Sequence, residues 1–558
     1  MAKSDLRIDI LGTSFTISTD EDPVYLTMLL EKYRQTLDNV QRISGLKDPI
    51  KIAVLTGFLL CDDLEKAGSG AAPSKNEDAG EAELLTLGMI SRLDEIMVPG
   101  TEQTPAPCSI VKLQNPVKNY EWGSPEWIPA LLGQRNTSRV PWAELWMGVN
   151  PSAPSRVAGA AAEGETAPLL PDLINEKKEA FLGEETAAAF GKLPYLFKVL
   201  AAAKPLSIQA HPSREQAREG FERENREGIP LDAAVRNYKD PNYKPEIICA
   251  LGPFVAICGF RKIHEICALI GILSRDSEGE LKSGFERLNS ALKQEEENPY
   301  RAFLTALFDL RKDALESLGP FLKKRQVQLE RDFPEYQDEW DLCSYLASLY
   351  RLDSGIIAPL YLNIMELSNG EALFIPHGVL HAYIHGLGIE LMADSDNVLR
   401  GGLTSKHVDT EELFRTLNFS DFKPEIEKVP APAPSWFTYP GRADEFALSV
   451  MKSAGNAVSF RETGPSIVIV TQGSAVLSAP GMQGDELIKT GESVFIPGRP
   501  PAGGKNGEIV FSGNFTAYAA APGKTGSSAC ADSNSESRAA DTPGNAAADD
   551  IPEELIPL

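Results

Sequence analysis

The chain has 558 residues, 42% of them hydrophobic, which is enough for roughly two to four domains with separate cores. Its formal net charge of −25 argues against partners that need a basic patch, such as nucleic acid or an anionic membrane surface. The N-terminal MAKSDLRIDILG lacks a signal segment, and the longest nearly uncharged run, 247–260, is too short to cross a bilayer. We therefore expect a cytoplasmic protein that binds neither nucleic acid nor membrane.

The first residues predict a small ββαα module. Apolar and polar residues alternate through LRIDI and, after Gly12, through TSFTI, which is typical of a β-hairpin. Helices are expected after Asp22-Pro23 and after Asp48-Pro49, the second ending near Gly68. Linker-like segments at 67–80 and 99–108 then enclose a short helix over 81–97.

Two stretches of this module, LRIDILGTSFTISTDED and LKDPIKIAVLTGFLLCDDL, resemble the ZapA family of bacterial cell-division proteins. The resemblance covers about the first 97 residues. It implies a ZapA-like domain over 1–98, with an FtsZ-type bacterial tubulin homologue as its partner.

In the remaining chain the pattern of apolar and polar residues changes twice. From about Cys108, short apolar strands with many Gly and Pro turns predict an antiparallel barrel or sandwich. Between Lys262 and Leu352 helical periodicity predicts an all-helical insertion. Strand patterns resume at Ile364 and continue to about Ala521. The Ala-, Ser- and Asp-rich segment 523–558 is expected to be a disordered acidic tail.

Metal-ligating residue types occur at three places outside the helical stretch. In LSIQAHP, strand alternation puts Gln209 and His211 on one face, together with Ser207. Glu246 lies in DPNYKPE, and PHGVLHAYIHG holds three of only six histidines. Imidazole and carboxylate ligands favour zinc or a similar divalent ion, although each residue alone also fits an ordinary polar strand position. The seven cysteines form no C-x-x-C pair and indicate reduced thiols rather than ligands.

The three clustered histidines have different expected roles. A strand after the PHG turn would present His381, Tyr383 and His385 on one face, and one of the three histidines should bind the metal. His377, in the turn, is expected to make a local hydrogen bond. His385, beside a glycine, is expected at the rim of the site.

Several long motifs, in order along the chain, carry a second resemblance. They are NYEWG, AELWMGVNPSAPS, LPYLFKVLAAAKPLSIQAHPS, DPNYKPE and GEALFIPHGVLHAYIHGLGIELMADSDNVLRGGLTSKHVD, and they resemble the type I mannose-6-phosphate isomerase family from about Val111 to Pro522. The resemblance implies a mainly β fold with two cupin-like (jelly-roll) barrels plus an all-α domain, here preceded by the ββαα module. The domains implied are a catalytic barrel over 109–261 and 353–440, a helical insertion over 262–352 and a second barrel over 441–522.

The resemblance also implies roles for individual residues. One zinc ion per chain would be held by Gln209, His211, Glu246 and His381, which selects His381 from the three histidines. The residues lining the catalytic site would be Arg400, Lys244, Tyr383, Glu390 and Asp396. The substrate would contact Trp122 and, through its phosphate, Lys198, Ser207 and Lys406. Without the resemblance, the two lysines would fit a solvated surface, Trp122 a core aromatic position, and Asp396 an ion pair with Arg400.

The implied activity is interconversion of mannose 6-phosphate and fructose 6-phosphate by zinc-assisted proton transfer through an enediol(ate). Tyr243 replaces a histidine usual in the family, and Asn150 stands where histidine is frequent, so the proton-transfer base stays open. One alternative is a non-catalytic sugar-phosphate-binding or Z-ring-associated protein. Another is an iron-dependent cupin oxygenase, but Gln209 and a single carboxylate favour zinc.

Overall fold

The structure is a computed structural model that describes residues 4–10, 13–19, 23–44, 56, 110–159, 167–294, 297–441, 443–479, 482, 484–498 and 508–523. The predicted second helix of the N-terminal module except Thr56, the predicted third helix, both linkers and nearly all of the predicted tail lie outside these residues. None of the described helices is both long and apolar enough to span a bilayer.

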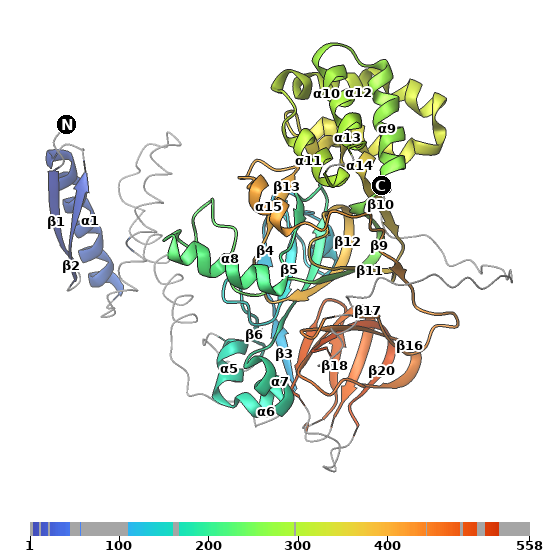
Figure 1. The fold of residues 1–558 in the computed structure, drawn as a ribbon. Helices are drawn as coiled ribbons and strands as arrows, with labels where there is room; N and C mark the ends of the chain where they lie inside the picture. The colour runs from blue at the N-terminus through green and yellow to red at the C-terminus, as the bar shows by residue number, and fades with distance from the viewer. Residues whose placement is uncertain are drawn as a thin grey trace.

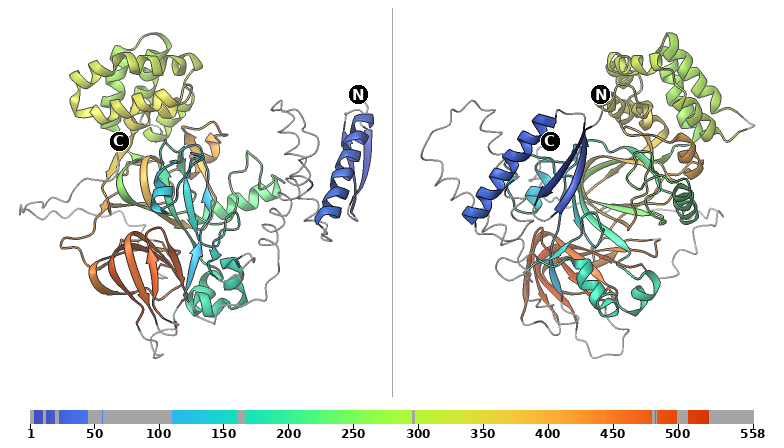
Figure 2. Two further views of the ribbon diagram at one scale, coloured as in Figure 1. Left: turned by 180° about the vertical axis from the view of Figure 1, so that it is seen from behind. Right: turned by 90° about the vertical axis from the view of Figure 1, so that its left-hand side faces the viewer.

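The N-terminal elements form the predicted hairpin and first helix. Strands β1 (Ser4–Ile10) and β2 (Thr13–Thr19) pair antiparallel, and α1 (Pro23–Ser44) follows. Proline at the first helical position is favourable because its missing N–H has no intrahelical partner there. Figures 1 and 2 draw these elements apart from the rest of the described chain.

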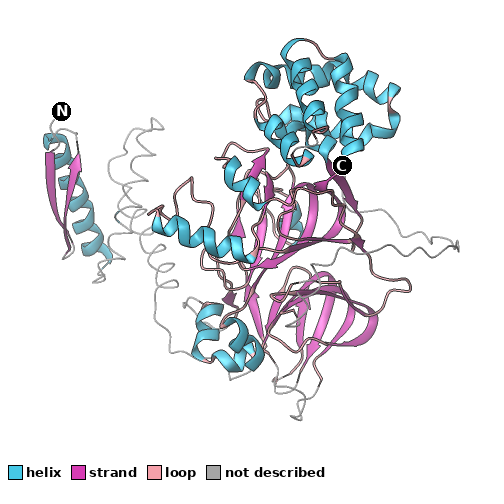
Figure 3. Cartoon of the chain, in the orientation of Figure 1, coloured by secondary structure: helices cyan, strands magenta, loops and turns pink. Residues whose placement is uncertain are grey.

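The rest of the described chain is mainly β, as expected, with two antiparallel sheets (Figure 3). The larger sheet has ten strands and includes the strands that carry the predicted metal ligands. Its strands are β4 (Val117–Lys118), β5 (Glu144–Met147), β7 (Tyr195–Ala202), β8 (Ile208–Ala210), β9 (Glu246–Phe260), β10 (Leu362–Leu367), β11 (Ala372–Ile375), β12 (His381–Ala393), β13 (Leu399–Gly402) and β14 (Ile426–Glu427).

The second sheet has eight strands, drawn in orange and red in Figure 1 apart from two strands nearer the N-terminus. Those two, β3 and β6, fall in the stretch expected for the first barrel but pair with the C-terminal sheet, where β19 joins β3. The strands are β3 (Val111–Gln114), β6 (Arg156–Val157), β15 (Trp436–Thr438), β16 (Ala447–Ser459), β17 (Ser466–Ser478), β18 (Glu486–Lys489), β19 (Ser493–Ile496) and β20 (Val510–Ala521).

Helices fill the predicted helical stretch, and the described residues of 262–352 include no strand. They are α9 (Ile263–Asp276), α10 (Gly279–Ala291), α11 (Pro299–Phe308), α12 (Lys312–Asp332) and α13 (Gln337–Leu349), drawn in light green and yellow in Figure 1. Apolar side chains such as Leu269, Phe303 and Trp340 face a common core, because the 3.6-residue period gathers them on one side of each helix.

Short helices also interrupt the stretch in which the sequence pattern indicated only strands. They are α4 (Trp127–Leu131), α5 (Leu170–Glu176), α6 (Lys178–Leu182), α7 (Glu184–Phe190) and α8 (Arg214–Arg226). The start of α8 is fixed by a capping box, in which Ser213 and Gln216 each accept a hydrogen bond from the other's backbone N–H. This cap directly follows His211-Pro212 and so fixes the chain beside the predicted metal site.

Candidate metal centre and active site

Three adjacent strands of the larger sheet bring the predicted metal ligands together. Gln209 lies in the middle of β8, Glu246 begins β9, and His381 begins β12. In the register of the sheet, His381 is opposite Gln209 on one side and Cys258 on the other. His211 follows β8 directly. Glu246 and His381 begin antiparallel strands, where Glu246 pairs with Met392, so side chains up to 172 positions apart converge from opposite ends of the β9–β12 ladder.

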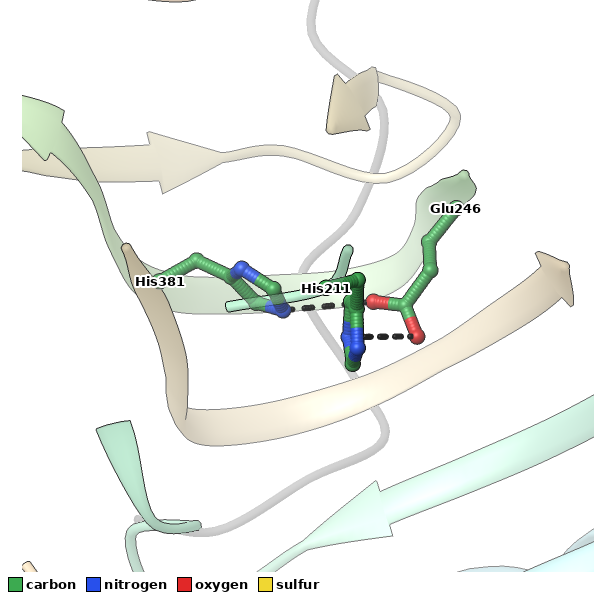
Figure 4. Close-up of side chains that lie close together, drawn as sticks. All are labelled: His211, Glu246 and His381. Carbon is green, nitrogen blue, oxygen red and sulfur yellow. Dashed lines mark ion pairs between the residues drawn. The ribbon is translucent and has the colours of Figure 1, made fainter. Parts of the chain in front are cut away.

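The side chains of His211, Glu246 and His381 converge, as Figure 4 shows. One ligand atom from each lies within 4.8 Å of the other two, and all three side chains are buried. His211 Nε2 is 3.3 Å from one carboxylate oxygen of Glu246, and His381 Nε2 is 3.3 Å from the other. This is the only such group of three among the residues that the structure describes.

Backbone carbonyls determine the tautomer of each imidazole. The nitrogen that faces the carboxylate is therefore the one without a proton. His211 Nδ1 lies 2.7 Å from the carbonyl of Asn397, and His381 Nδ1 lies 3.0 Å from that of Val379. Since a carbonyl only accepts, each Nδ1 carries the proton and each Nε2 presents a lone pair. Two lone pairs therefore point at a carboxylate that accepts from neither ring, and a cation between them would satisfy all three groups.

Burial and charge support the neutral histidine that a metal needs. Burial, together with the nearby Lys244 ammonium, lowers the pKa of His211 to about 4. Burial by itself would raise the pKa of Glu246, but the nearby Lys244 ammonium outweighs it and holds that pKa well below its usual range. A carboxylate with two neutral imidazoles is a donor set that suits zinc.

Gln209 lies at the same point. Its side-chain amide nitrogen is 3.4 Å from His381 Nε2. The amide oxygen and nitrogen can exchange places by rotation of the amide group, which would turn the oxygen toward the same space. With that rotation, the side-chain oxygen of Gln209 would offer a fourth ligand atom.

Comparison with known proteins identifies the family to which the chain belongs. The family model for the phosphomannose isomerase type I catalytic domain matches residues 110–263. The mannose-6-phosphate isomerase of Salmonella typhimurium is 39% identical over 388 residues, covering 69% of this chain and 94% of the relative. The chain belongs to the mannose-6-phosphate isomerase family.

Further relatives and solved structures extend the comparison. The Escherichia coli isomerase is 38% identical over 388 residues, again covering 69% of this chain and 94% of the relative. A zinc-bound mannose 6-phosphate isomerase structure has a TM-score of 0.65 and 35% identity, covering 74% of this chain and all of the other. A separate family model, cell division protein ZapA, matches residues 6–96.

Beside the candidate metal site lies a buried charge network. Lys198 Nζ lies 2.8 Å from Glu390 and 3.3 Å from Glu144, and all three side chains are less than a tenth exposed. Glu144 also accepts from the indole of Trp146. Burial alone would lower the pKa of Lys198, but the two carboxylates raise it. Lys198, which was expected to bind the substrate phosphate, therefore forms ion pairs with two carboxylates.

Glu390, a member of this network, and Tyr383 both lie near enough to Glu246 to feel its charge. Burial raises the pKa of Glu390, with Glu246 and Glu144 adding to the rise and Lys198 opposing it. Burial also raises the pKa of Tyr383, which feels the charges of both Glu246 and Glu390. Lys244, on the other side of the carboxylate ligand, places Nζ 2.7 Å from Glu246.

The remaining predicted residues lie further out. Arg400, on β13, is opposite Gln209 in the sheet and is half-buried, which lowers its pKa. Asp396 is exposed, and no ion pair joins it to Arg400 in the part of the chain that the structure describes. Lys406 is exposed and feels the charges of Arg400 and Lys239, whereas Ser207 is half-buried. Trp122 packs against the apolar cluster that contains Tyr383.

Two of the clustered histidines stay away from the metal ligands. The alternation expected from His381 to His385 ends at a bulge in β12, where the register shifts between Tyr383 and His385. His385 is therefore exposed and makes an edge contact with Trp127 at 5.0 Å between ring centroids. His377 is half-buried in the turn, and its carbonyl accepts from Asn418.

Tyr243 and Asn150, which stand where the resemblance leads one to expect histidine, both make side-chain hydrogen bonds to acidic residues. The hydroxyl of Tyr243 donates to Glu445 at 2.6 Å, and the guanidinium of Arg214 lies over its ring and also binds Glu445. Asn150 donates to Asp394. Both residues thus tie segments of the chain together.

Sequence reasoning missed Glu144, Trp146 and Asn397. The first two stand inside AELWMG, a motif used only for the resemblance, where strand alternation already put both on one face. Asn397 gave no signal, because its role depends on a backbone carbonyl.

Proposed function

We propose that this chain interconverts mannose 6-phosphate and fructose 6-phosphate with one zinc ion held by Gln209, His211, Glu246 and His381. The observation that carries the proposal is the buried meeting of two imidazole lone pairs with a carboxylate. When bound, zinc would supply a positive charge that polarises and orients the sugar oxygens at C1 and C2.

The reaction moves one proton between neighbouring carbons. We assign this transfer to Glu390, because burial raises its pKa toward the range in which a carboxylate is an effective base. Glu390 takes the proton from C2 of the open-chain aldose, and the electron pair of that C–H bond forms the C1–C2 double bond of the enediol(ate). The electrons of the C1 carbonyl move to its oxygen in the same step. Return of the proton to C1, with transfer of the proton on the C2 oxygen to the C1 oxygen, produces the ketose.

Cationic side chains complete the proposal. Lys244 and Arg400 would stabilise negative charge on the enediolate oxygens, and Lys198 would hold Glu390 in place through their ion pair. Because Lys198 is paired with two carboxylates, we propose that Lys406 and Ser207, which lie nearer the surface, bind the phosphate. Binding the phosphate there would orient the carbons that react.

A coupled assay for fructose 6-phosphate, with mannose as the control substrate, tests this function. We expect turnover of mannose 6-phosphate and little of mannose, because only the former has the phosphate handle. A zinc-loaded, folded protein that binds mannose 6-phosphate without turning it over would instead establish the sugar-phosphate-binding alternative.

We propose that Tyr243 is a structural residue and not the proton carrier. Tyr243→Phe should leave kcat nearly unchanged, because the hydroxyl is bonded to Glu445. The variant should lose about 1–2 kcal/mol of unfolding free energy with the charged hydrogen bond. Steady-state kinetics and denaturant unfolding measure both quantities, and a large fall in kcat with normal stability would contradict the assignment.

The N-terminal module is proposed to work separately from the isomerase. Removal of residues 1–104 should leave kcat and KM nearly unchanged, since the isomerase family model matches residues 110–263, beyond the ZapA segment. Loss of turnover in a folded truncated protein would mean that the two parts communicate. Co-sedimentation with polymers of an FtsZ-type protein, with the truncated chain as control, tests the proposed partner.

A further inference from the structure

Asn397 is a fully buried residue in the turn between β12 and β13. Its side-chain oxygen accepts from the backbone N–H groups of Lys239 at 2.7 Å and Asp240 at 3.3 Å. Its side-chain nitrogen donates to the backbone carbonyls of Asp240 at 2.8 Å and Asn242 at 2.9 Å. One amide group therefore holds the segment 239–242 through four backbone contacts.

The main chain of the same residue reaches a metal ligand. The carbonyl of Asn397 accepts from Nδ1 of His211 at 2.7 Å, the contact that leaves Nε2 facing Glu246. The segment that the side chain holds leads within a few residues to Lys244 and Glu246. Asn397 thus connects the orientation of one ligand with the position of another that is distant in sequence.

Only asparagine offers this combination at this length. Its amide supplies an acceptor to two N–H groups and two N–H donors to two carbonyls. Aspartate would set an oxygen against the carbonyls of Asp240 and Asn242, and alanine would leave four backbone groups without these partners.

We infer that Asn397 is a positioning residue for the metal site, which sets the His211 ring and fixes the segment that leads to Glu246. The inference rests on the proposed function for its zinc site. Partners that orient metal ligands typically change metal affinity about 10–100-fold when they are replaced.

Asn363 provides a matched control. It is also a buried asparagine, and its side-chain nitrogen donates to backbone carbonyls of Cys258, Gly259, Phe260 and Phe422, none of them a site residue. Replacing it should cost comparable stability because similar buried hydrogen bonds are lost.

The test compares Asn397→Asp and Asn397→Ala with Asn363→Asp and Asn363→Ala. Zinc affinity is measured by competition with a chromophoric chelator, alongside thermal unfolding of the zinc-free proteins. We expect the Asn397 variants to bind zinc about 10–100-fold more weakly and the Asn363 variants to bind it as the wild type does. If an alanine variant fails to fold, Asn397→Ser, which retains one donor and one acceptor, replaces it in the comparison.

Wild-type zinc affinity in folded Asn397 variants would overturn the inference, and so would equal weakening in the Asn363 variants. Wild-type isomerase activity is measured in parallel. An inactive wild type whose zinc binding still depends on Asn397 would refute the proposed function and leave the positioning role intact.

Discussion

Glu390→Gln should lower kcat by about 10²–10⁴ while zinc content stays at the wild-type value, because the amide cannot take a proton from C2. Glutamine keeps the size of the side chain and can still accept from Lys198, so packing around the site should change little. Steady-state kinetics with metal analysis on the same preparation measures both quantities.

Glu144→Gln is the matched control, since Glu144 is the second carboxylate on Lys198 and is equally buried. It should lower stability and leave most of the turnover. Comparable losses of kcat in both variants would mean that the network has a structural role and that Glu390 is not the base. Solvent exchange of the C2 hydrogen, followed by NMR, should likewise disappear in Glu390→Gln alone.

Arg400→Ala should lower kcat by about 10²–10³ with unchanged zinc content, the usual cost of losing one preorganised group that stabilises developing negative charge. Arg400 lies opposite Gln209 in the sheet, and burial lowers its pKa without a carboxylate partner in the described structure to neutralise it. Its charge is thus available to the reacting oxygens. Arg400→Lys should rescue only part of the activity, because an ammonium lacks the planar fork of the guanidinium.

Arg214→Ala is the control for a structural arginine, since Arg214 binds Glu445 and covers Tyr243. It should reduce thermal stability with little change in kcat. The opposite pattern for Arg400→Ala, reduced stability with normal turnover per folded molecule, would rule out its catalytic role.

Local patterns in the sequence were sufficient to predict much of the fold. Alternation predicted the hairpin of β1 and β2, and helical periodicity predicted the helices from α9 to α13. The pairing of β3 with β19 was not predictable, because alternation identifies a strand and not its distant partner. The helices α5–α7 are too short to produce a clear periodic signal.

The candidate site was likewise predictable in part from the sequence. The scarcity of histidine and the shared face of Gln209 and His211 indicated a metal, and the family resemblance selected His381. The physical reason that His385 differs, a bulge in β12, requires the register of the sheet. The commitment of Lys198 to Glu144 and Glu390, and the carbonyl of Asn397, also depend on contacts between distant segments.

Titration of the zinc-free chain with Zn²⁺, with fructose 6-phosphate formation recorded at each addition, tests the central claim most directly. We predict that activity rises in proportion to bound zinc and stops rising at about one ion per chain, and that His211→Ala neither retains the ion nor regains activity. Full activity in the zinc-free protein, or zinc-saturated folded protein without turnover, would contradict the account.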